Sequence, residues 1–347
     1  MDAQLVYSEA ELLTDHEFAA PHIIDGKRMH GGLLADGAYQ PPRAAVREPA
    51  LAAWQQALQA RGGRMYPASA DLLGGERSPN VEQSRVLLRN GLGQTFWNSL
   101  TITGKIEARG RVLAEATFPD LQKYIVEDIS TMAIGHLNNG LLKAHGIDEG
   151  GEPERGIGGH DAMWFVARDM AFGPDAYPDA NPEENISRPE AGARFMPEIS
   201  ATAEGLLSLL MNLLIIEFRA EIGFAATEQL LRTPDLFADR REEAELAAVV
   251  VDRIRADEAI HVRSLCLYLG ELESVTFHTV EGGTVAGATL IDRFWHGLVR
   301  WATVDQPRQV AALQREIIER RIAAHPDAER VLREFHAAAD LASSVPA

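Results

Sequence analysis

The sequence is poor in cysteine and in basic residues, and each shortage excludes a class of protein. Cys266 is the single cysteine among 347 residues, so the chain can form no intramolecular disulfide and no zinc site of the usual thiolate kind. The 33 Lys and Arg residues are outnumbered by 51 Asp and Glu residues, which gives a net charge of −18. Because binding to nucleic acid or to an anionic membrane requires clustered positive charge, we expect neither partner.

Long hydrophobic runs are also missing. The longest apolar stretch, residues 206–216, contains Ser208 and Asn212 and is too short to span a bilayer, which takes about 20 residues. The first residues show no basic segment followed by an apolar one, as a secretory signal would. Together with the lone cysteine, these features predict a soluble protein of the cytoplasm.

The sequence does contain the hydrophobic periodicity of α-helices. Apolar residues recur at helical spacing from residue 81 onward, whereas residues 1–50 are punctuated by Gly and Pro. The expected long helices are 93–117, 121–145, 199–231 and 240–269, with shorter ones at 48–61, 160–172, 290–302 and 307–324 and another after 326. Residues 272–290 suggest a hairpin or an irregular crossover.

Short breaks within two helix pairs, and a long Pro-rich connection between the pairs, predict an all-α fold built on a four-helix bundle with one crossover. We expect residues 1–90 to form an N-terminal arm and loop region packed on the core. Residues 91–272 would form the bundle and residues 273–347 a C-terminal helical extension, in one compact domain.

The sharpest local signal is the segment Asp257-Glu258-Ala-Ile-His261. Residues three apart on a helix project to the same side, and the side that carries Glu258 and His261 also carries Ile254 and Leu265. A carboxylate and an imidazole on a core face are costly to bury unless something compensates them, and a metal ion would do so. The alternative is that Glu258 pairs with an arginine while His261 is a hydrogen-bonded core histidine.

The preceding long helix carries a second buried carboxylate. Glu217 follows about two turns of apolar residues, which leaves it little access to water. Glu221 lies four residues further on the same face, where a shared cation would relieve the repulsion. Alternatively, Glu221 is solvated and pairs with Arg219 or Arg232.

A lone Glu on one helix and Asp-Glu-x-x-His on the next resembles the second half of a ferritin-like di-iron carboxylate bundle. In that family a Glu from each of two helices and a Glu-x-x-His from each of the other two bind two metal ions. The resemblance covers residues 199–269 and implies that Glu217, Glu258 and His261 are metal ligands. It also implies two metal ions, with Fe favoured over Mn or Zn.

The first half of the chain departs from this pattern, because its second expected helix has no Glu-x-x-His. Glu107 fits the lone Glu, and His136 is the candidate nearest to the right depth opposite it, with Asp128 as a weaker option. His160 could swing in as the missing ligand, oriented by Asp161. The alternatives are an exposed Glu107, a satisfied core His136 and an Asp161 that merely caps its helix.

The resemblance implies an oxidoreductase that uses dioxygen to oxidise a small molecule, with an electron donor as partner. A metal-free helical scaffold and a single-metal hydrolase are the alternatives from other classes. The sequence identifies no substrate and leaves the oligomeric state, including a homo-oligomer, open.

Overall fold

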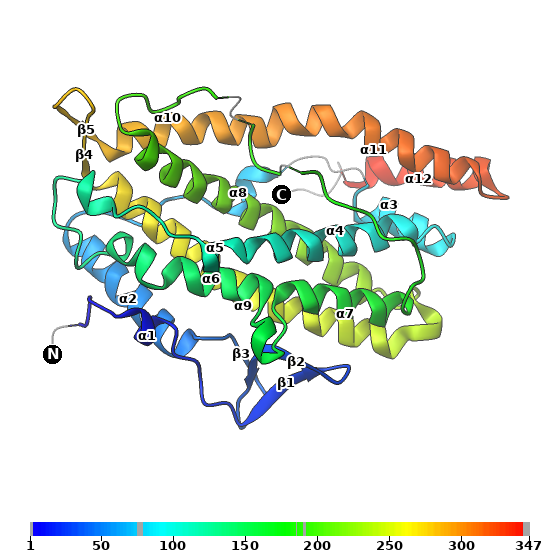
Figure 1. Cartoon of the computed structure of the whole chain (residues 1–347). Coiled ribbons are helices and arrows are strands. Elements are labelled where there is room, and N and C mark those ends of the chain that lie inside the picture. Colours follow the sequence, from blue (N-terminus) through cyan, green and yellow to red (C-terminus); the bar gives the residue numbers. More distant parts are fainter. Residues whose placement is uncertain (1–2, 75–78, 185, 190–191, 343–347) are drawn as a thin grey trace.

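The structure, a computed structural model, describes residues 3–74, 79–184, 186–189 and 192–342, and it is mostly helical (Figure 1). The principal helices are α2 (Ala44–Ala60), α3 (Val81–Arg89), α4 (Gln94–Gly110), α6 (Leu141–Gly150), α7 (His160–Phe172), α8 (Ala201–Leu231), α9 (Arg241–Glu273), α10 (Gly287–Arg300), α11 (Gln306–Ala323) and α12 (Ala328–Ala342). Short helices are α1 (Glu9–Leu12) and α5 (Val112–Glu115), and the strands are β1 (Ala20–Ile24), β2 (Lys27–Leu33), β3 (Tyr39–Gln40), β4 (Thr276–His278) and β5 (Thr284–Ala286). The prediction of a mainly helical fold is confirmed.

The centre of the molecule is a bundle in which α8 packs on α9, α9 on α7, and both α6 and α7 on α4. Figure 1 shows α6 and α7 following one another along one line, in the place of a single long helix. The long helices form because their apolar residues recur at helical spacing and face these neighbours. Ser200 caps the start of α8 by accepting from the backbone N–H of Ala203, as its residue type favours.

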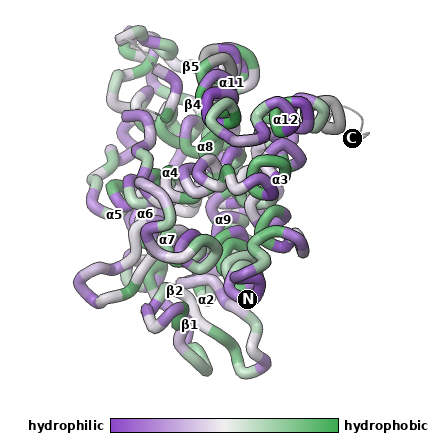
Figure 2. The backbone as a smooth tube through the Cα atoms, turned by 90° about the vertical axis from the view of Figure 1, so that its right-hand side faces the viewer, coloured by the Kyte–Doolittle hydropathy of each residue, from purple (hydrophilic) through white to green (hydrophobic). Residues whose placement is uncertain are grey.

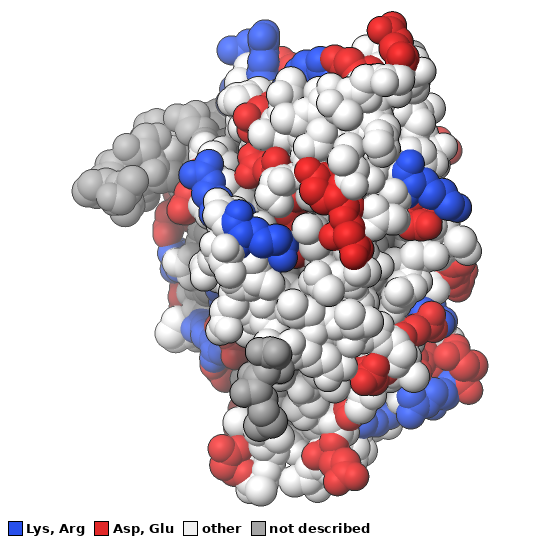
Figure 3. Space-filling view, turned by 90° about the vertical axis from the view of Figure 1, so that its left-hand side faces the viewer, with Lys and Arg blue, Asp and Glu red and all other residues white. Residues whose placement is uncertain are grey.

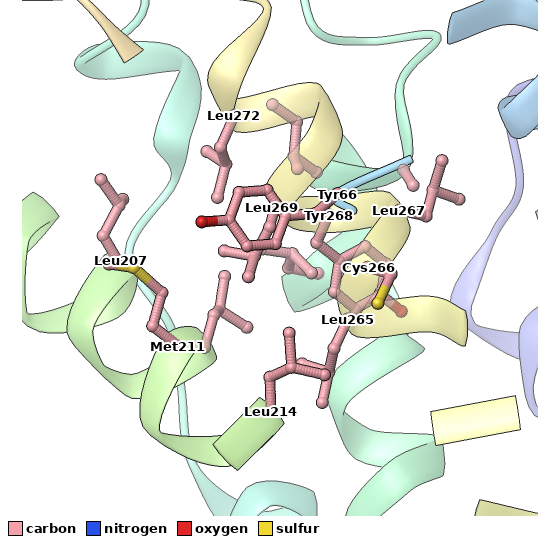
Figure 4. Packing of buried hydrophobic residues seen from close by; sticks show 14 of the residues in the cluster. Tyr66, Leu207, Met211, Leu214, Leu265, Cys266, Leu267, Tyr268, Leu269 and Leu272 are labelled. Carbon is pink, nitrogen blue, oxygen red and sulfur yellow. The ribbon is translucent and has the colours of Figure 1, made fainter. Parts of the chain in front are cut away.

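Helix α8 is the most apolar element of the bundle. It is long and apolar enough to cross a membrane by length and composition alone, but 67% of its most apolar window is buried inside the protein. Figure 4 shows Leu207, Met211 and Leu214 of α8 facing Leu265 and Leu269 of α9. The apolar stretch is therefore the core-facing side of a bundle helix in this fold.

The N-terminal arm contains a small antiparallel sheet that the sequence did not predict. Strands β1, β2 and β3 pair in that order, and β2 is also joined to the loop between α6 and α7. The backbone N–H of His30 donates to Gly158 O at 2.9 Å, and Gly158 N–H donates to Arg28 O at 2.9 Å. These bonds fix the arm against the bundle, at the bottom of Figure 1.

The helix predicted over residues 121–145 was wrong. Residues 121–140 form 3₁₀ turns and bends, and α6 begins only at Leu141 and continues to Gly150. Side chains form hydrogen bonds with backbone groups that would otherwise bond within a helix. Gln122 donates to Glu127 O at 2.8 Å and accepts from Ile129 N–H at 2.9 Å. The first long helix is also shorter than predicted, because α4 ends at Gly110 and only the short α5 follows.

The C-terminal elements cover the opposite side of the bundle. Figure 2 shows the arm with β1, β2 and α2 at one end, α11 and α12 at the other, and the bundle helices between them. Within residues 272–290, residues 276–286 form the hairpin β4–β5, one of the two structures predicted there. On the face drawn in Figure 3, Lys and Arg are interspersed with Asp and Glu among the described residues, with no continuous basic patch.

Candidate metal centre

Seven carboxylate and imidazole side chains meet inside the bundle, and each is at most 6% exposed to solvent. Every bundle helix contributes at least one of them. They are Glu107 of α4, His145 and Glu149 of α6, His160 at the start of α7, Glu217 of α8, and Glu258 and His261 of α9.

One group consists of His145, Glu149, Glu217 and His261, whose ligand atoms all lie within 4.8 Å of one another. His145 Nε2 is 3.0 Å from Glu217 Oε1 and 3.4 Å from Glu149 Oε1. His261 Nδ1 is 3.4 Å from the same oxygen of Glu149. The imidazole rings of His145 and His261 stack with centroids 3.8 Å apart, so both rings present an edge to the same carboxylates. We call this group the two-histidine position.

The other group consists of Glu107, Glu149, His160 and Glu258, again with ligand atoms within 4.8 Å of one another. His160 Nδ1 is 3.1 Å from Glu258 Oε1, 3.6 Å from Glu107 Oε2 and 3.8 Å from Glu149 Oε1. We call this group the one-histidine position. Glu149 belongs to both groups, and the two oxygens of Glu258 face His160 and His261 respectively, so these two carboxylates lie between the positions.

Two nitrogen atoms in the cluster favour a metal over a simple hydrogen-bond network. His145 Nε2 and His160 Nδ1 are buried and make no well-aligned hydrogen bond, although carboxylate oxygens lie 3.0 Å and 3.1 Å from them. A buried polar atom without a partner is costly, and an imidazole lone pair is a common metal ligand. Two donor atoms that share one ion at about 2.1 Å lie about 3.0–3.4 Å apart, which is close to the spacing found here.

The charges of the cluster also fit two divalent ions. If all six carboxylates, those of the four glutamates and of the adjacent Asp148 and Asp257, were ionised, the guanidinium groups of Arg43 and Arg47 would balance two of the charges and leave four. Two divalent cations would balance them. Residues Glu107, Glu149, Glu217, Glu258, His145 and His160 therefore have the types, burial and spacing that metal binding requires, and so does His261.

Without a cation, three of the four glutamates, Glu149, Glu217 and Glu258, resist ionisation. Burial and then the charge of Glu258 raise the pKa of Glu217 to about 7. Burial and the neighbouring Glu107 and Glu258 raise the pKa of Glu149 well above its usual range, while burial also lowers the pKa of His145 to about 4 and keeps it neutral. A neutral imidazole can donate its lone pair to a metal.

Two aspartates orient the histidines in a crossed arrangement. Asp257 precedes Glu258 on α9 but accepts from Nε2 of His160 at 3.2 Å. Asp148 precedes Glu149 on α6 but accepts from Nε2 of His261 at 3.1 Å. Each bond turns the Nδ1 of its histidine toward the glutamates, as second partners of metal ligands do.

The N-terminal arm supplies the other partners of both aspartates. Asp257 accepts from His30 Nε2 at 3.0 Å and from the Tyr39 hydroxyl at 2.9 Å, whereas Asp148 accepts from Arg43, just before α2, and from Arg47 of α2. Burial alone would raise the pKa of Asp148, but the two guanidinium groups hold it well below its usual value. The arm, which the sequence indicated only as a covering segment, thus completes the cluster.

Glycine residues let the helices approach closely around the cluster. A Cβ on Gly110 would lie 2.6 Å from Cγ of Glu149, so α4 passes directly over that side chain. A Cβ on Gly159 would lie 2.3 Å from Gly151 N and 2.7 Å from Glu149 O, so the two ends of the α6–α7 loop touch. This loop closure brings Glu149 and His160 together although ten residues separate them.

The structure brings five of the predicted ligands into the cluster, namely Glu107, His160, Glu217, Glu258 and His261. It places His136 elsewhere: Nδ1 of His136 donates to Met132 O at 2.8 Å and Nε2 accepts from Tyr7 N–H at 3.1 Å. Both ring nitrogens of His136 are satisfied, so the ligand prediction for this residue is corrected to a core histidine. Its displacement follows from the missing helix over residues 121–140.

The weaker candidates also lie outside the ligand set. Asp128 is exposed and accepts from Ser130 N–H, and Glu221 is exposed on α8. Asp161 accepts from Ala162 N–H in its own helix, so it does not orient His160. Asp257 takes that role instead.

Sequence reasoning missed Asp148 and Glu149 because the second long helix was predicted to end at residue 145, whereas α6 continues to Gly150, and it missed His145 because the predicted helix began twenty residues too early. A signal was present: the dipeptide Asp148-Glu149 repeats Asp257-Glu258. The first half therefore contains an Asp-Glu…His arrangement like that of α9, but its histidine, His160, follows a loop inserted between α6 and α7.

In comparisons with known proteins, no protein-family model, no curated protein and no solved structure matches the chain.

Proposed function

We propose that this protein is a ferritin-like enzyme with a dinuclear metal centre, iron being the favoured metal, that uses dioxygen to oxidise a small molecule. The observation that carries the proposal is the buried cluster of four glutamates and three histidines, in which two imidazole nitrogens make no well-aligned hydrogen bond. Manganese or zinc would also suit carboxylate and imidazole ligands. A reducing compartment such as the cytoplasm fits the single buried cysteine.

The residues of the chain have separable roles in this proposal. Glu149 and Glu258 lie between the two positions and would hold both ions, while Glu107 and Glu217 would each hold one. Carboxylates can change between one and two bound oxygens as a metal changes valence, which suits redox chemistry. Asp148 and Asp257 keep the histidine nitrogens aimed at the cluster.

Bound iron would supply the capacity to reduce dioxygen. If one oxygen atom enters the substrate and the other leaves as water, two further electrons and two protons must come from outside, so we propose an electron donor as partner. The burial of every ligand excludes bulk water, which protects such a reaction from side reactions.

Dioxygen uptake by iron-loaded protein tests this function. Protein loaded with Fe²⁺ without oxygen should consume dioxygen faster than the same concentration of free Fe²⁺ once oxygen is added. Glu217→Gln should abolish the excess, whereas Glu221→Gln, an exposed residue one turn further on α8, should keep it. No excess uptake by the wild type, or equal uptake by Glu217→Gln, would contradict the proposal. Retention of one zinc ion with ester hydrolysis would instead favour the single-metal hydrolase.

A further inference from the structure

The two positions of the cluster differ in their nitrogen content. The two-histidine position has His145 Nε2 and His261 Nδ1 beside the carboxylates of Glu149 and Glu217. The one-histidine position has only His160 Nδ1, surrounded by Glu107, Glu149 and Glu258. His145 has no counterpart there among the described residues, so the asymmetry lies in the ligands themselves.

The residues that hydrogen-bond to the histidines increase the difference between the two positions. Asp148, which holds His261, is neutralised by Arg43, just before α2, and by Arg47 on α2. Asp257, which holds His160, receives its other hydrogen bonds from the uncharged Tyr39 hydroxyl and from His30. The surroundings of the one-histidine position are therefore the more anionic of the two.

The backbone shows that the arginine arrangement is held in place. Arg43 has a φ of 57°, in the left-handed region that a non-glycine residue rarely adopts. Its side chain pairs with Asp148 and its N–H donates to Asp15 Oδ1 at 3.0 Å. Arg43 thus adopts a strained backbone conformation and is held both at its backbone N–H and at its side chain. We infer that the fold maintains the positive charge of Arg43 beside Asp148.

Imidazole ligands suit Fe²⁺, whereas carboxylate-rich, anionic sites suit Mn²⁺, which binds largely through charge. We propose that the centre selects different ions at its two positions, with Fe²⁺ at the two-histidine position and Mn²⁺ at the one-histidine position. The inference rests on the proposed dinuclear centre and specifies which residues distinguish the ions. His145 is the residue that decides the selectivity.

Anomalous X-ray diffraction tests this assignment directly. The full chain is loaded without oxygen with one equivalent each of Fe²⁺ and Mn²⁺, and crystals are measured on both sides of the iron and manganese absorption edges. Limiting metal is essential, because an excess of Fe²⁺ would outcompete Mn²⁺ at both positions. We expect iron beside His145 and His261 and manganese beside Glu107 and His160.

Variants test whether His145 causes the preference. In His145→Gln the ratio of iron to manganese at the two-histidine position should fall about tenfold or more, while the other position keeps its manganese. His136→Gln, at a buried histidine outside the cluster, should leave both ratios unchanged. An unchanged ratio in a folded His145→Gln protein would overturn the role of His145.

The wild-type measurement separates two kinds of failure. Two bound ions with equal iron-to-manganese ratios at both positions, or with the reverse order, would overturn the selectivity and leave the dinuclear centre intact. Absence of bound metal from both positions would contradict the proposed function as well.

Discussion

Asp257 accepts a hydrogen bond from His160 at 3.2 Å, although 97 positions separate the two residues. The bond joins the start of α7 to the middle of α9, and its counterpart joins Asp148 of α6 to His261. The two halves of the chain thus exchange orienting partners across the cluster, so the position of each of these two histidines depends on the opposite half.

Asp257→Asn should weaken metal binding without unfolding the protein. The amide oxygen can still accept from His160, but the lost negative charge makes the imidazole a poorer ligand. We expect a loss of metal affinity of about 10–100-fold, with an unchanged far-UV circular dichroism spectrum. Titration with Mn²⁺, followed by calorimetry, measures the change. Wild-type affinity in this variant would show that Asp257 does not position a ligand.

Glu217→Gln should stabilise the metal-free protein and remove its stabilisation by metal. Burial and Glu258 raise the pKa of Glu217 to about 7, so above that pH the ionised form opposes folding. The neutral amide should raise the free energy of unfolding of the metal-free protein by about 1–3 kcal/mol near pH 8. Urea denaturation with and without Mn²⁺ tests both effects. A destabilised metal-free variant would contradict the claim that the carboxylates repel one another.

Gly159→Ala should disturb the closure of the α6–α7 loop. Its Cβ would meet the backbone of Gly151, Asp148 and Glu149 at 2.3–2.7 Å, and backbone atoms cannot move aside cheaply. We expect a loss of about 2–4 kcal/mol and weaker metal binding. Gly156→Ala in the same loop is the control, because nothing lies within 4 Å of its Cβ and only its φ of +64° adds about 1–2 kcal/mol. Equal losses in both variants would argue against the contact.

Glu271 should make stability depend on pH independently of the metal centre. It is fully buried, accepts from Ile134 N–H at 3.0 Å, and burial raises its pKa to about 7. Because the folded pKa lies above the unfolded value of about 4.3, folding binds a proton between these pH values. The stabilisation is therefore present below about pH 4 and is lost as the pH rises to about 7.

The variant Glu271→Gln isolates this effect. The unfolding free energy of the wild type should fall relative to that of the variant by up to about 1.4 kcal/mol per pH unit across this range. Parallel urea titrations of the two metal-free proteins measure the difference, and the groups of the metal cluster cancel in the comparison. A difference that stays constant with pH would contradict the raised pKa of Glu271.

The sequence pattern alone was sufficient to predict those helices and ligands whose evidence lies within a single helix. Glu217, Glu258 and His261 could be predicted because a charged residue within an apolar helix face is anomalous in the sequence itself. The bounds of α7, α8 and α9 lie close to those expected for the same reason.

Interactions between distant segments could not be predicted in this way. His136 lay on a plausible helical stripe, but Gln122 and Glu271 take up backbone groups of that segment and no helix forms. Glu149 and His160 are joined only by a loop whose closure depends on Gly151 and Gly159. His30 and Tyr39 reach Asp257 through pairing of β2 with Gly158, a contact that no periodicity indicates.

Metal content per chain, measured by inductively coupled plasma mass spectrometry on protein produced with iron and manganese supplied, tests the central claim most directly. We predict about two metal ions in the wild type and in Glu221→Gln, because two divalent cations would balance the four charges that the fully ionised carboxylates leave beyond Arg43 and Arg47. Glu149→Ala, which removes a carboxylate shared by both positions, should lose both ions, whereas Glu107→Ala should lose one. A folded wild-type protein without bound metal would contradict the account and favour a metal-free helical scaffold.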